Sequence, residues 1–513
     1  MDGSSQVKPF QHLGRRPTGL GRPWAAMLCL AFGLLSAACT GTPDNRVSGG
    51  EPDPIAALGP GAVVSYALLD GETGAEIAAQ APDRPMIPAS TAKAATMIAA
   101  LELLGPDYRF ATRVLATGTP DAGGVLTGDL ILKGGGDPLL GPQDLLGLAQ
   151  RLHDLGLRRV TGRFLYDASL LPEQPSIEPN QPAEARYNPG IGALAVDFNQ
   201  WRLLWRDGEE VQQTQRLPPL TQFKVRRGPG AAGAGREVTW DGRTATDDTW
   251  RLAGHAPETG DRFLPVKDPG QATAALFRRL AGQIGIALPP PEAGTAPKGA
   301  APVAQVLGLP LSEVVRLGLQ HSNNLVAELI GLTAARLYKG RPENLETSAD
   351  ALSGWLHQAV TTRLGGMDWT GWRLLNHSGL SRESRVTAAQ MAAVLRFAQG
   401  RRYGGWPFAS FLPAAGFRRA FRDRFLTEDA VGRLWAKTGT MHYAKGLVGY
   451  LMDGTGRTRV FALYIADPAA RAAYDALSDA DRDAPEEQMR ARAWIDAAEQ
   501  AEEAIVSDWL KRF

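Results

Sequence analysis

The pattern of apolar and polar residues divides the chain into three successive regions. In the first, the apolar run Val63–Leu69 predicts a strand, and Asp70–Gly74 predicts the turn into a second strand near Glu76–Ala79. The run Ala94–Leu104 is apolar on all sides and stops at Gly105-Pro106, so it predicts a buried helix.

The middle region, residues 109–300, shows short strand-like runs separated by turn residues. Strands are expected at Arg113–Ala116, Val125–Leu132 and Arg159–Tyr166 and, as a hairpin, within 214–255; helices are expected at Gln143–Leu155 and Asp268–Ile284. A segment rich in proline, glycine and alanine at 288–302 ends this region.

The third region is helical at first and then returns to strands. Helical patterns cover Leu311–Tyr338, Ala349–Thr361 and Ala388–Arg401, strand candidates follow at Arg433–Ala436, Gly446–Leu451 and Arg459–Ile465, and Glu486–Phe513 reads as an amphipathic helix that packs on a sheet. The expected architecture is α/β (α+β), in which one domain, formed by 61–108 and 301–513, is split by an insertion at 109–300.

The N-terminus has the pattern of a bacterial secretory signal. Basic residues precede the apolar run Trp24–Leu35, and the small residues Ser36–Ala38 follow it. The run is shorter than the roughly 20 apolar residues that span a bilayer, and an uncleaved anchor is the alternative. We therefore expect a signal peptide at 1–38, a linker at 39–60 and a periplasmic location.

Composition excludes several classes of function. The net charge is +1, so no broad basic surface for nucleic acid is expected. Both cysteines, Cys29 and Cys39, lie in or beside the signal, which excludes disulfides, thiol catalysis and cysteine-ligated zinc from the rest of the chain. The seven histidines show no H-E-x-x-H pairing, so we expect no metal and no other cofactor.

Cys39 resembles a lipoprotein site with its leucine one position too far upstream, and contact with a membrane is expected only through a lipid anchor there.

A serine and a lysine stand three residues apart at the start of the apolar helix, Ser90 and Lys93 in IPASTAKAATMIAA. Residues at this spacing share one helix face. A lysine in apolar surroundings loses hydration, which lowers its pKa and lets it act as a base. The pair can therefore form a serine nucleophile that is activated without histidine. Alternatively, Ser90 only caps the helix and Lys93 reaches the surface.

Two further motifs favour catalysis. Ser322-Asn323-Asn324 opens a helix, and Lys437-Thr438-Gly439 lies at the end of a strand candidate. S-x-x-K, S-D-N and K-T-G occur together in penicillin-binding proteins and class A β-lactamases. The ordered set, each member on the expected type of element, is much more specific than any of the three motifs alone.

Each motif supplies one part of an acyl-transfer site. Ser90 would attack the substrate, Lys93 would take its proton, and Ser322 would relay a proton to the leaving group. The backbone N–H groups of Ser90 and Thr440 would form the oxyanion hole.

The remaining motif residues would hold the substrate. Asn324 would bind its amide, and Lys437 with Thr438 or Thr440 would bind its terminal carboxylate. Gly439 leaves room for the substrate to lie along the strand as an added strand.

Over about residues 60–470 the chain resembles the low-molecular-mass class C penicillin-binding proteins, a family of D-alanyl-D-alanine carboxypeptidases and endopeptidases. The further motifs that carry this resemblance are PAST-K around Ser90, LKGGGDP at 132–138, SGLSR at 378–382 and LPAAG at 412–416. The resemblance implies a penicillin-recognising fold, a five-stranded antiparallel sheet between helix layers with two small β-rich domains inserted after the S-x-x-K helix. It also implies a serine-type peptidase that cleaves peptidoglycan stem peptides and cross-links through an acyl-enzyme and is inhibited by β-lactam antibiotics.

The same resemblance implies residues that recognise the stem peptide near its diamino acid. The arginine of S-G-L-S-R and the residue after K-T-G-T correspond to Arg382 and Met441, and Asp167 is aligned with an acidic residue of the insertion that contacts the same group. The departures from the family pattern are Asn376-His377 in place of D-G, Asn323 where aspartate is frequent, and Arg418–Ala420. These departures leave substrate preference open.

Two other functions compete with the peptidase. A β-lactamase or esterase of the same fold is one, but the class A β-lactamases use a water held by glutamate, and Glu343-Asn344 lies too near Asn324 to match their spacing. A catalytically weak cell-wall scaffold protein is the other, and the intact set of motif side chains argues against it.

Overall fold

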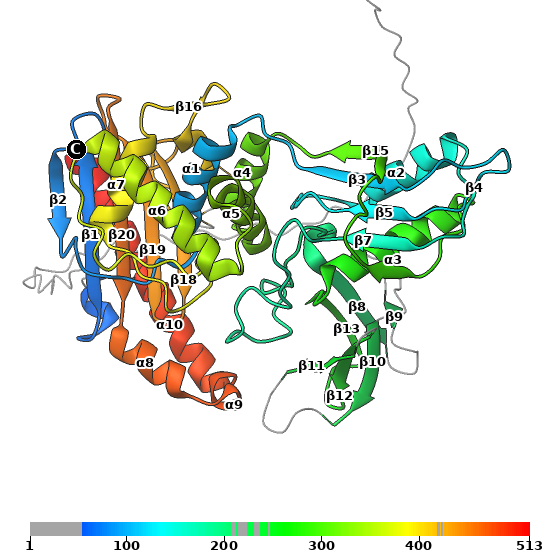
Figure 1. The fold of residues 1–513 in the computed structure, drawn as a ribbon. Helices are drawn as coiled ribbons and strands as arrows, with labels where there is room; N and C mark the ends of the chain where they lie inside the picture. Colours follow the sequence, from blue (N-terminus) through cyan, green and yellow to red (C-terminus); the bar gives the residue numbers. More distant parts are fainter. Residues whose placement is uncertain are drawn as a thin grey trace, which may run out of the picture. The chain divides into compact units, whose positions relative to one another are not determined.

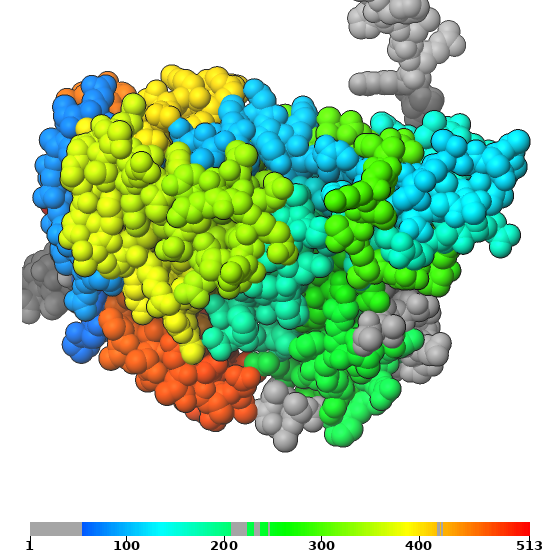
Figure 2. Space-filling model, viewed as in Figure 1, coloured from blue at the N-terminus to red at the C-terminus, as the bar shows by residue number. Residues whose placement is uncertain are grey.

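An antiparallel five-stranded sheet brings early and late parts of the chain together (Figure 1). Its strands, in spatial order, are β18 (Leu434–Met441), β19 (Ala444–Met452), β20 (Thr458–Ala466), β1 (Val63–Asp70) and β2 (Glu76–Gln80). Strand β1 pairs with β20 along its whole length, from Val63 opposite Ala466 to Asp70 opposite Arg459. In the space-filling view these blue N-terminal strands lie beside the yellow-green surface of later helices (Figure 2). The expected five-stranded antiparallel sheet is confirmed.

The computed structural model describes residues 54–206, 212–213, 223–229, 236–244, 247–417, 421 and 424–513. The expected signal peptide at 1–38, Cys39 and the departure at Arg418–Ala420 lie outside these residues. Among the residues described, no helix is long and apolar enough to cross a membrane.

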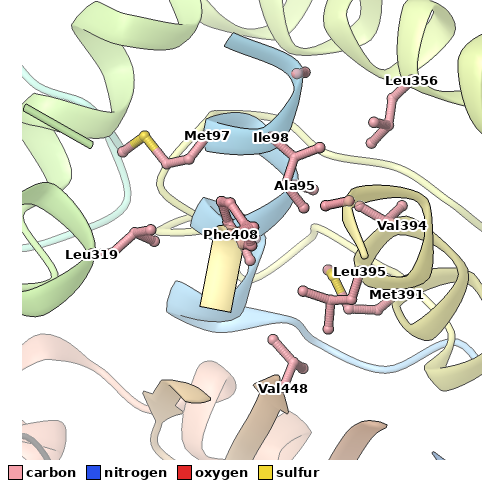
Figure 3. Close-up of a cluster of buried hydrophobic side chains, with 14 of the residues drawn as sticks. Ala95, Met97, Ile98, Leu319, Leu356, Met391, Val394, Leu395, Phe408 and Val448 are labelled. Carbon is pink, nitrogen blue, oxygen red and sulfur yellow. The ribbon is translucent and has the colours of Figure 1, made fainter. Parts of the chain in front are cut away.

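Helices cover both faces of the sheet, because neighbouring residues of a strand point to opposite sides. On one face, Val448 lies in a buried cluster with side chains of α1 (Ala92–Leu104) and α7 (Ala388–Ala398) (Figure 3), and Tyr464 belongs to the same cluster. On the other face, Leu447, Leu463 and their neighbours pack against α10 (Pro485–Arg512). The C-terminal helix thus packs on the sheet, as its amphipathic pattern predicts.

The helical run expected at Leu311–Tyr338 is two helices. The helices of this part are α4 (Leu311–Gln320), α5 (Asn324–Lys339) and α6 (Leu345–Leu364), and α8 (Pro468–Ala476) and α9 (Asp479–Arg482) precede α10. The break falls at Ser322, because its φ of 51° lies outside the range of a right-handed α-helix. The Asn323 side chain then accepts a hydrogen bond from the N–H of Val326 and caps the second helix. The expectation that Ser322-Asn323-Asn324 opens a helix is confirmed, and this opening divides the helical pattern at Leu311–Tyr338.

The inserted region and the strand that follows it form a second five-stranded sheet. Its strands, in spatial order, are β14 (Pro291–Ala293), β7 (Phe164–Asp167), β5 (Leu130–Lys133), β3 (Ala111–Ala116) and β15 (Ala301–Leu307), and its helices are α2 (Pro142–Asp154) and α3 (Pro269–Gln283). The strands expected at Val125–Leu132 and Arg159–Tyr166 are each divided, because short strands β4 (Val125–Leu126) and β6 (Arg159–Val160) pair separately. Gly128 and Gly162 mark the division, since a Cβ on Gly162 would lie 2.4 Å from the carbonyl oxygen of Gly128.

Among the residues that the structure describes, the inserted region also contains two three-stranded sheets. One contains β13 (Thr259–Pro265), β8 (Gln200–Arg206) and β9 (Gln212–Gln213), and the other contains β10 (Phe223–Gly228), β12 (Asp248–Ala253) and β11 (Val238–Arg243). Strands β11 and β12 are antiparallel, which confirms the hairpin expected within 214–255. Trp201 links the two sheets by stacking on Phe223 and meeting Trp250 edge-on.

Candidate active site

Ser90 lies in a strained turn that leads into the buried helix. A 3₁₀ turn, Ala89–Thr91, precedes α1, and Ala89 has a φ of 45°. Left-handed backbone in a residue with a side chain costs about 1–3 kcal/mol and is concentrated at functional sites. The apolar helix that follows buries Lys93 completely, so the alternative in which this lysine reaches the surface is wrong.

The Lys93 amine is shared by three oxygens. Its Nζ lies 2.8 Å from Ser90 Oγ, 2.7 Å from Asn324 Oδ1 and 2.9 Å from the carbonyl oxygen of Ser378. Burial and, second, the charge of Lys437 hold the pKa of Lys93 well below its ordinary value. A neutral amine keeps two N–H donors for the amide and the carbonyl, and its lone pair then faces the Ser90 hydroxyl. This is the arrangement that a general base requires.

The break between α4 and α5 positions two other motif residues. Ser322 has its left-handed backbone at this break, and Asn324 begins α5. The Asn324 side chain binds Lys93 with its oxygen and donates from Nδ2 to the carbonyl oxygen of Tyr187 in the inserted region, at 2.9 Å. One amide therefore orients the lysine and also fixes a segment of the insertion next to the serine.

Strand β18 brings the third motif to the same place. Lys437 is buried, and its Nζ donates to the Thr438 carbonyl oxygen at 2.7 Å. Burial, and to a lesser extent the charge of Lys445, lowers the Lys437 pKa to about 7. Gly439 lies against the serine turn, because a Cβ there would be 2.6 Å from the carbonyl oxygen of Pro88 and 3.1 Å from the backbone nitrogen of Ser90.

This close approach gives a direct prediction for Gly439→Ala. The added methyl group must push β18 away from the turn, because a backbone carbonyl cannot yield as a side-chain tip does. A misplacement of about 1 Å can cost about 10²-fold in rate, so we expect acylation of Ser90 by penicillin to slow by up to about that factor. Gly454→Ala, at a glycine with no atom near its Cβ position, is the matched control. Equal acylation rates for the two variants would show that the contact does not matter.

The S-G-L-S-R segment closes over the serine turn. Gly379 has a φ of 73°, and a Cβ on it would lie 1.9 Å from the Ala89 carbonyl oxygen. The departures before it are accommodated by local packing: Asn376 accepts a hydrogen bond from the Leu380 N–H at 3.0 Å, and the buried His377 ring lies 2.8 Å from Ser348 Oγ. Burial lowers the His377 pKa to about 3, so this ring is neutral and structural.

Glu328 is a site residue that the motifs did not reveal. Its fully buried carboxylate accepts hydrogen bonds of 2.9 Å from the backbone N–H groups of His377 and Ser378. The carbonyl of Ser378 in turn accepts from Lys93, and the Glu328 charge works against the lowering of the Lys93 pKa. The available signal was a lone acid four residues after Asn324 in the otherwise apolar NLVAELIGL.

A cleft of about 1070 Å³ opens at Ser90. The predicted site residues that line it are Ser90, Ser322, Asn324, Arg382, Thr440 and Met441. Lys93 and Lys437 are buried beneath it, and Thr438 and Gly439 connect Lys437 to Thr440 along β18. Ten of the eleven predicted site residues are therefore in or next to one cleft.

Arg382 is engaged in an ion pair on the wall of this cleft. Its Nη1 donates to Asp475 Oδ1 at 2.9 Å, and the same carboxylate accepts from Arg471 at 2.7 Å. A substrate acid that binds Arg382 must therefore compete with Asp475.

Asp167 is not brought to this cleft. Its buried carboxylate lies 3.1 Å from Lys133 Nζ and accepts hydrogen bonds from Ser169 and from the N–H of Ala296, all in the inserted region. These donors hold its pKa below the ordinary value against the effect of burial. The structure thus gives Asp167 a set of internal partners rather than a place on the cleft wall.

Comparison with known proteins places this geometry in a family. A family model described as "D-Ala-D-Ala carboxypeptidase 3 (S13) family" matches residues 56–483. The chain is 28% identical over 440 residues to carboxypeptidase DacB of Mycolicibacterium smegmatis (81% of this chain, 79% of the relative). It is 28% identical over 432 residues to a D-alanyl-D-alanine carboxypeptidase of an Actinomadura species (77% of this chain, 76% of the relative).

A solved structure shares the fold. The crystal structure of penicillin binding protein 4 from Haemophilus influenzae superposes with a TM-score of 0.69 at 22% identity, covering 81% of this chain and 92% of that one. The predicted fold class is confirmed by this likeness. The family match over most of the chain shows that the chain belongs to the D-Ala-D-Ala carboxypeptidase 3 (S13) family, as the motifs predicted, and is a serine-type hydrolase.

Proposed function

We propose that this protein hydrolyses the D-alanyl-D-alanine end of peptidoglycan stem peptides, and the cross-links between stems, through an acyl-enzyme on Ser90. The observation that carries the proposal is the buried Lys93 amine, 2.8 Å from Ser90 Oγ and held from its other side by Asn324 and Ser378. A buried lysine with a lowered pKa beside a serine is a nucleophile with its base.

In the proposed reaction, neutral Lys93 takes the Ser90 proton while Oγ attacks the carbonyl carbon of the penultimate D-alanine. The backbone N–H groups of Ser90 and Thr440 stabilise the oxyanion, a contribution of about 3–4 kcal/mol per donor in comparable sites. Ser322 passes a proton to the leaving amine. Water then attacks the ester, and the same groups act in the reverse direction to release Ser90.

The substrate is held on both sides of the scissile bond. Lys437, Thr438 and Thr440 bind the terminal carboxylate, and Asn324 orients the amide. Arg382 and Met441, both on the cleft wall, contact the stem near its diamino acid. Asp167 has no part in this proposal, because its partners lie in the inserted region.

β-Lactams are proposed as inhibitors that acylate the same serine. A structure of the Haemophilus influenzae penicillin binding protein 4 is described as complexed with a novel β-lactam. That protein has the fold of this chain, and Ser90 at the cleft with Lys93 and Lys437 buried next to it supports the same type of ligand here.

The domain plan and the location are proposed together. Residues 1–38 would be a signal peptide that directs the protein to the periplasm, 39–60 a linker with a lipid anchor at Cys39, and 61–108 with 301–513 the catalytic domain. The insertion at 109–300 would be extended by β15, which pairs with β3 of the inserted sheet.

Globomycin treatment of expressing cells would test the lipid anchor at Cys39, since a lipidated chain would accumulate with its signal uncleaved.

The test of the proposed function is to map the acylated residue. The protein is incubated with fluorescent penicillin, digested, and its labelled peptide is sequenced by mass spectrometry; digestion of purified muropeptides is followed in parallel. We expect one adduct, on Ser90, and release of D-alanine or of monomeric stems. An adduct on another residue, or labelling without any muropeptide turnover, would contradict the proposal, and the latter would favour a scaffold protein.

A further inference from the structure

A second lysine lies behind the carboxylate anchor, and the reaction described above does not use it. Lys445 is the cross-strand partner of Thr440 in the β18–β19 hairpin and is only 2% exposed. Its Nζ donates to Thr440 Oγ1 at 2.8 Å and to Glu499 Oε1, on α10, at 2.6 Å. A buried ammonium on an apolar strand (AKGLVGYL) needs a physical reason, because its desolvation is costly.

The hydrogen bond from Lys445 determines what the Thr440 hydroxyl can do. A hydroxyl has a single hydrogen to donate. Since Thr440 Oγ1 accepts from the ammonium, its own hydrogen is directed to a different acceptor. Thr440 lines the cleft, and among the described contacts no protein acceptor is present for that hydrogen. The arrangement therefore presents Thr440 to the cleft as a donor, strengthened by the charge behind it.

Lys445 places a positive charge directly behind Thr440, beside the cleft. Its described charged neighbours on the α10 face of the sheet are Glu499, which it contacts, and Arg424, which contacts Glu499 and Glu502. The same charge acts on Lys437, whose pKa is lowered mainly by burial and, second, by Lys445. An anion in the cleft next to Thr440 would interact favourably with both lysines.

We propose that Lys445 is a positioning residue of the carboxylate anchor: it fixes the Thr440 hydroxyl as a donor and supplies positive charge for a substrate that ends in a free carboxylate. The inference rests on the proposed function and adds a specificity to it. Lys445 would favour peptides with a free D-alanine carboxylate, and Glu499 would hold Lys445 in place from α10.

The test uses two peptide substrates that differ at one group, a D-Ala-D-Ala peptide with a free carboxylate and the same peptide as its C-terminal amide. Lys445→Met keeps the length and apolar stem of the side chain and removes its charge. We expect the KM for the carboxylate peptide to rise about tenfold, the size of one charge-assisted hydrogen bond, while kcat and the KM for the amide peptide change by less than about twofold. Thr440→Val added to Lys445→Met should cause little further loss, because the two residues act as one unit.

Glu499→Gln separates the electrostatic role from a structural one. It preserves an oxygen acceptor for Lys445 and removes the opposing negative charge, so the KM for the carboxylate peptide should fall or stay at the wild-type value. A merely structural pair would instead lose activity on both peptides in both variants. Thermal unfolding of each variant reports the structural cost separately.

The outcomes discriminate between the two proposals. If wild type turns over both peptides and Lys445→Met raises both KM values equally, or neither, the role of Lys445 is overturned and the proposed function stands. If wild type turns over neither peptide and takes no label, both are overturned. If Lys445→Met does not fold, Glu499→Gln decides, and a raised KM for the carboxylate peptide alone would refute the inference.

Discussion

Lys93→Met is expected to slow the acylation of Ser90 by penicillin by about 10²–10⁴-fold at neutral pH, the contribution of a positioned general base. Methionine fills a similar volume and is compatible with full burial, so the fold should remain. What is lost is the nitrogen 2.8 Å from Ser90 Oγ. The measurement is the time course of fluorescent labelling, and Ser90→Ala, which cannot form the ester, gives the background.

The pH dependence provides a second measurement on the same variant. Only the neutral amine can accept the Ser90 proton, so the wild-type rate should rise as pH increases through the Lys93 pKa and level off above it. Because that pKa is far below the ordinary lysine value, the rise should be complete well below pH 10. The variant should lack this rise. Lys267→Met, at another buried lysine that does not line the cleft, is the control, and acylation by Lys93→Met at the control rate would rule out Lys93 as the base.

Glu328→Ala is expected to lower the free energy of unfolding by about 2–6 kcal/mol. The substitution leaves the buried N–H groups of His377 and Ser378 without their acceptor, at about 1–3 kcal/mol for each group. It should also slow acylation by the protein that remains folded, because the same segment holds Lys93 through the Ser378 carbonyl. Urea unfolding and labelling at low temperature measure the two effects.

A matched carboxylate elsewhere distinguishes stability from catalysis. Asp453 also accepts from two backbone N–H groups, those of Thr455 and Arg457, in the turn between β19 and β20. Asp453→Ala should therefore destabilise the protein but leave acylation by the folded fraction unchanged. Glu328→Gln should retain part of the stability and, by removing a charge that supports the ammonium form, lower the Lys93 pKa further. If Asp453→Ala slowed acylation as much as Glu328→Ala, the effect at Glu328 would be one of stability alone.

Local patterns were sufficient for much of the catalytic region. An apolar run around Lys93 predicted its burial, and the pattern at Arg433–Ala436 predicted the strand that leads into Lys437. The five-stranded sheet itself was an expectation from the family resemblance. The order of the three motifs predicted which residues meet in the cleft, because each motif stands at the end of an element. These inferences depend on neighbours within a few positions, which the sequence displays directly.

The misses depend on contacts between distant residues. The left-handed backbone of Ser322 has no local signal, since serine, unlike glycine, has no preference for it. The partners of Glu328 are backbone amides some fifty positions away. The alignment of Asp167 rested on its order in the chain, which does not display its ion pair with Lys133 on the neighbouring strand. Lys445 could have been singled out by the reasoning applied to Lys93, as a charge within an apolar run.

The pairing of Val63 with Ala466 also determines when, during synthesis of the chain, the sheet of the catalytic region can form. The sheet that supports the cleft cannot close until β20 has been made, long after β1. The inserted region together with β15 contains every described strand of its own sheets and can fold earlier. Pairing between such distant segments is slow, because the loop must close before its contacts are gained. Ser90 and Lys437 therefore meet only late in synthesis, so a nascent chain that lacks β20 carries no assembled acylation site.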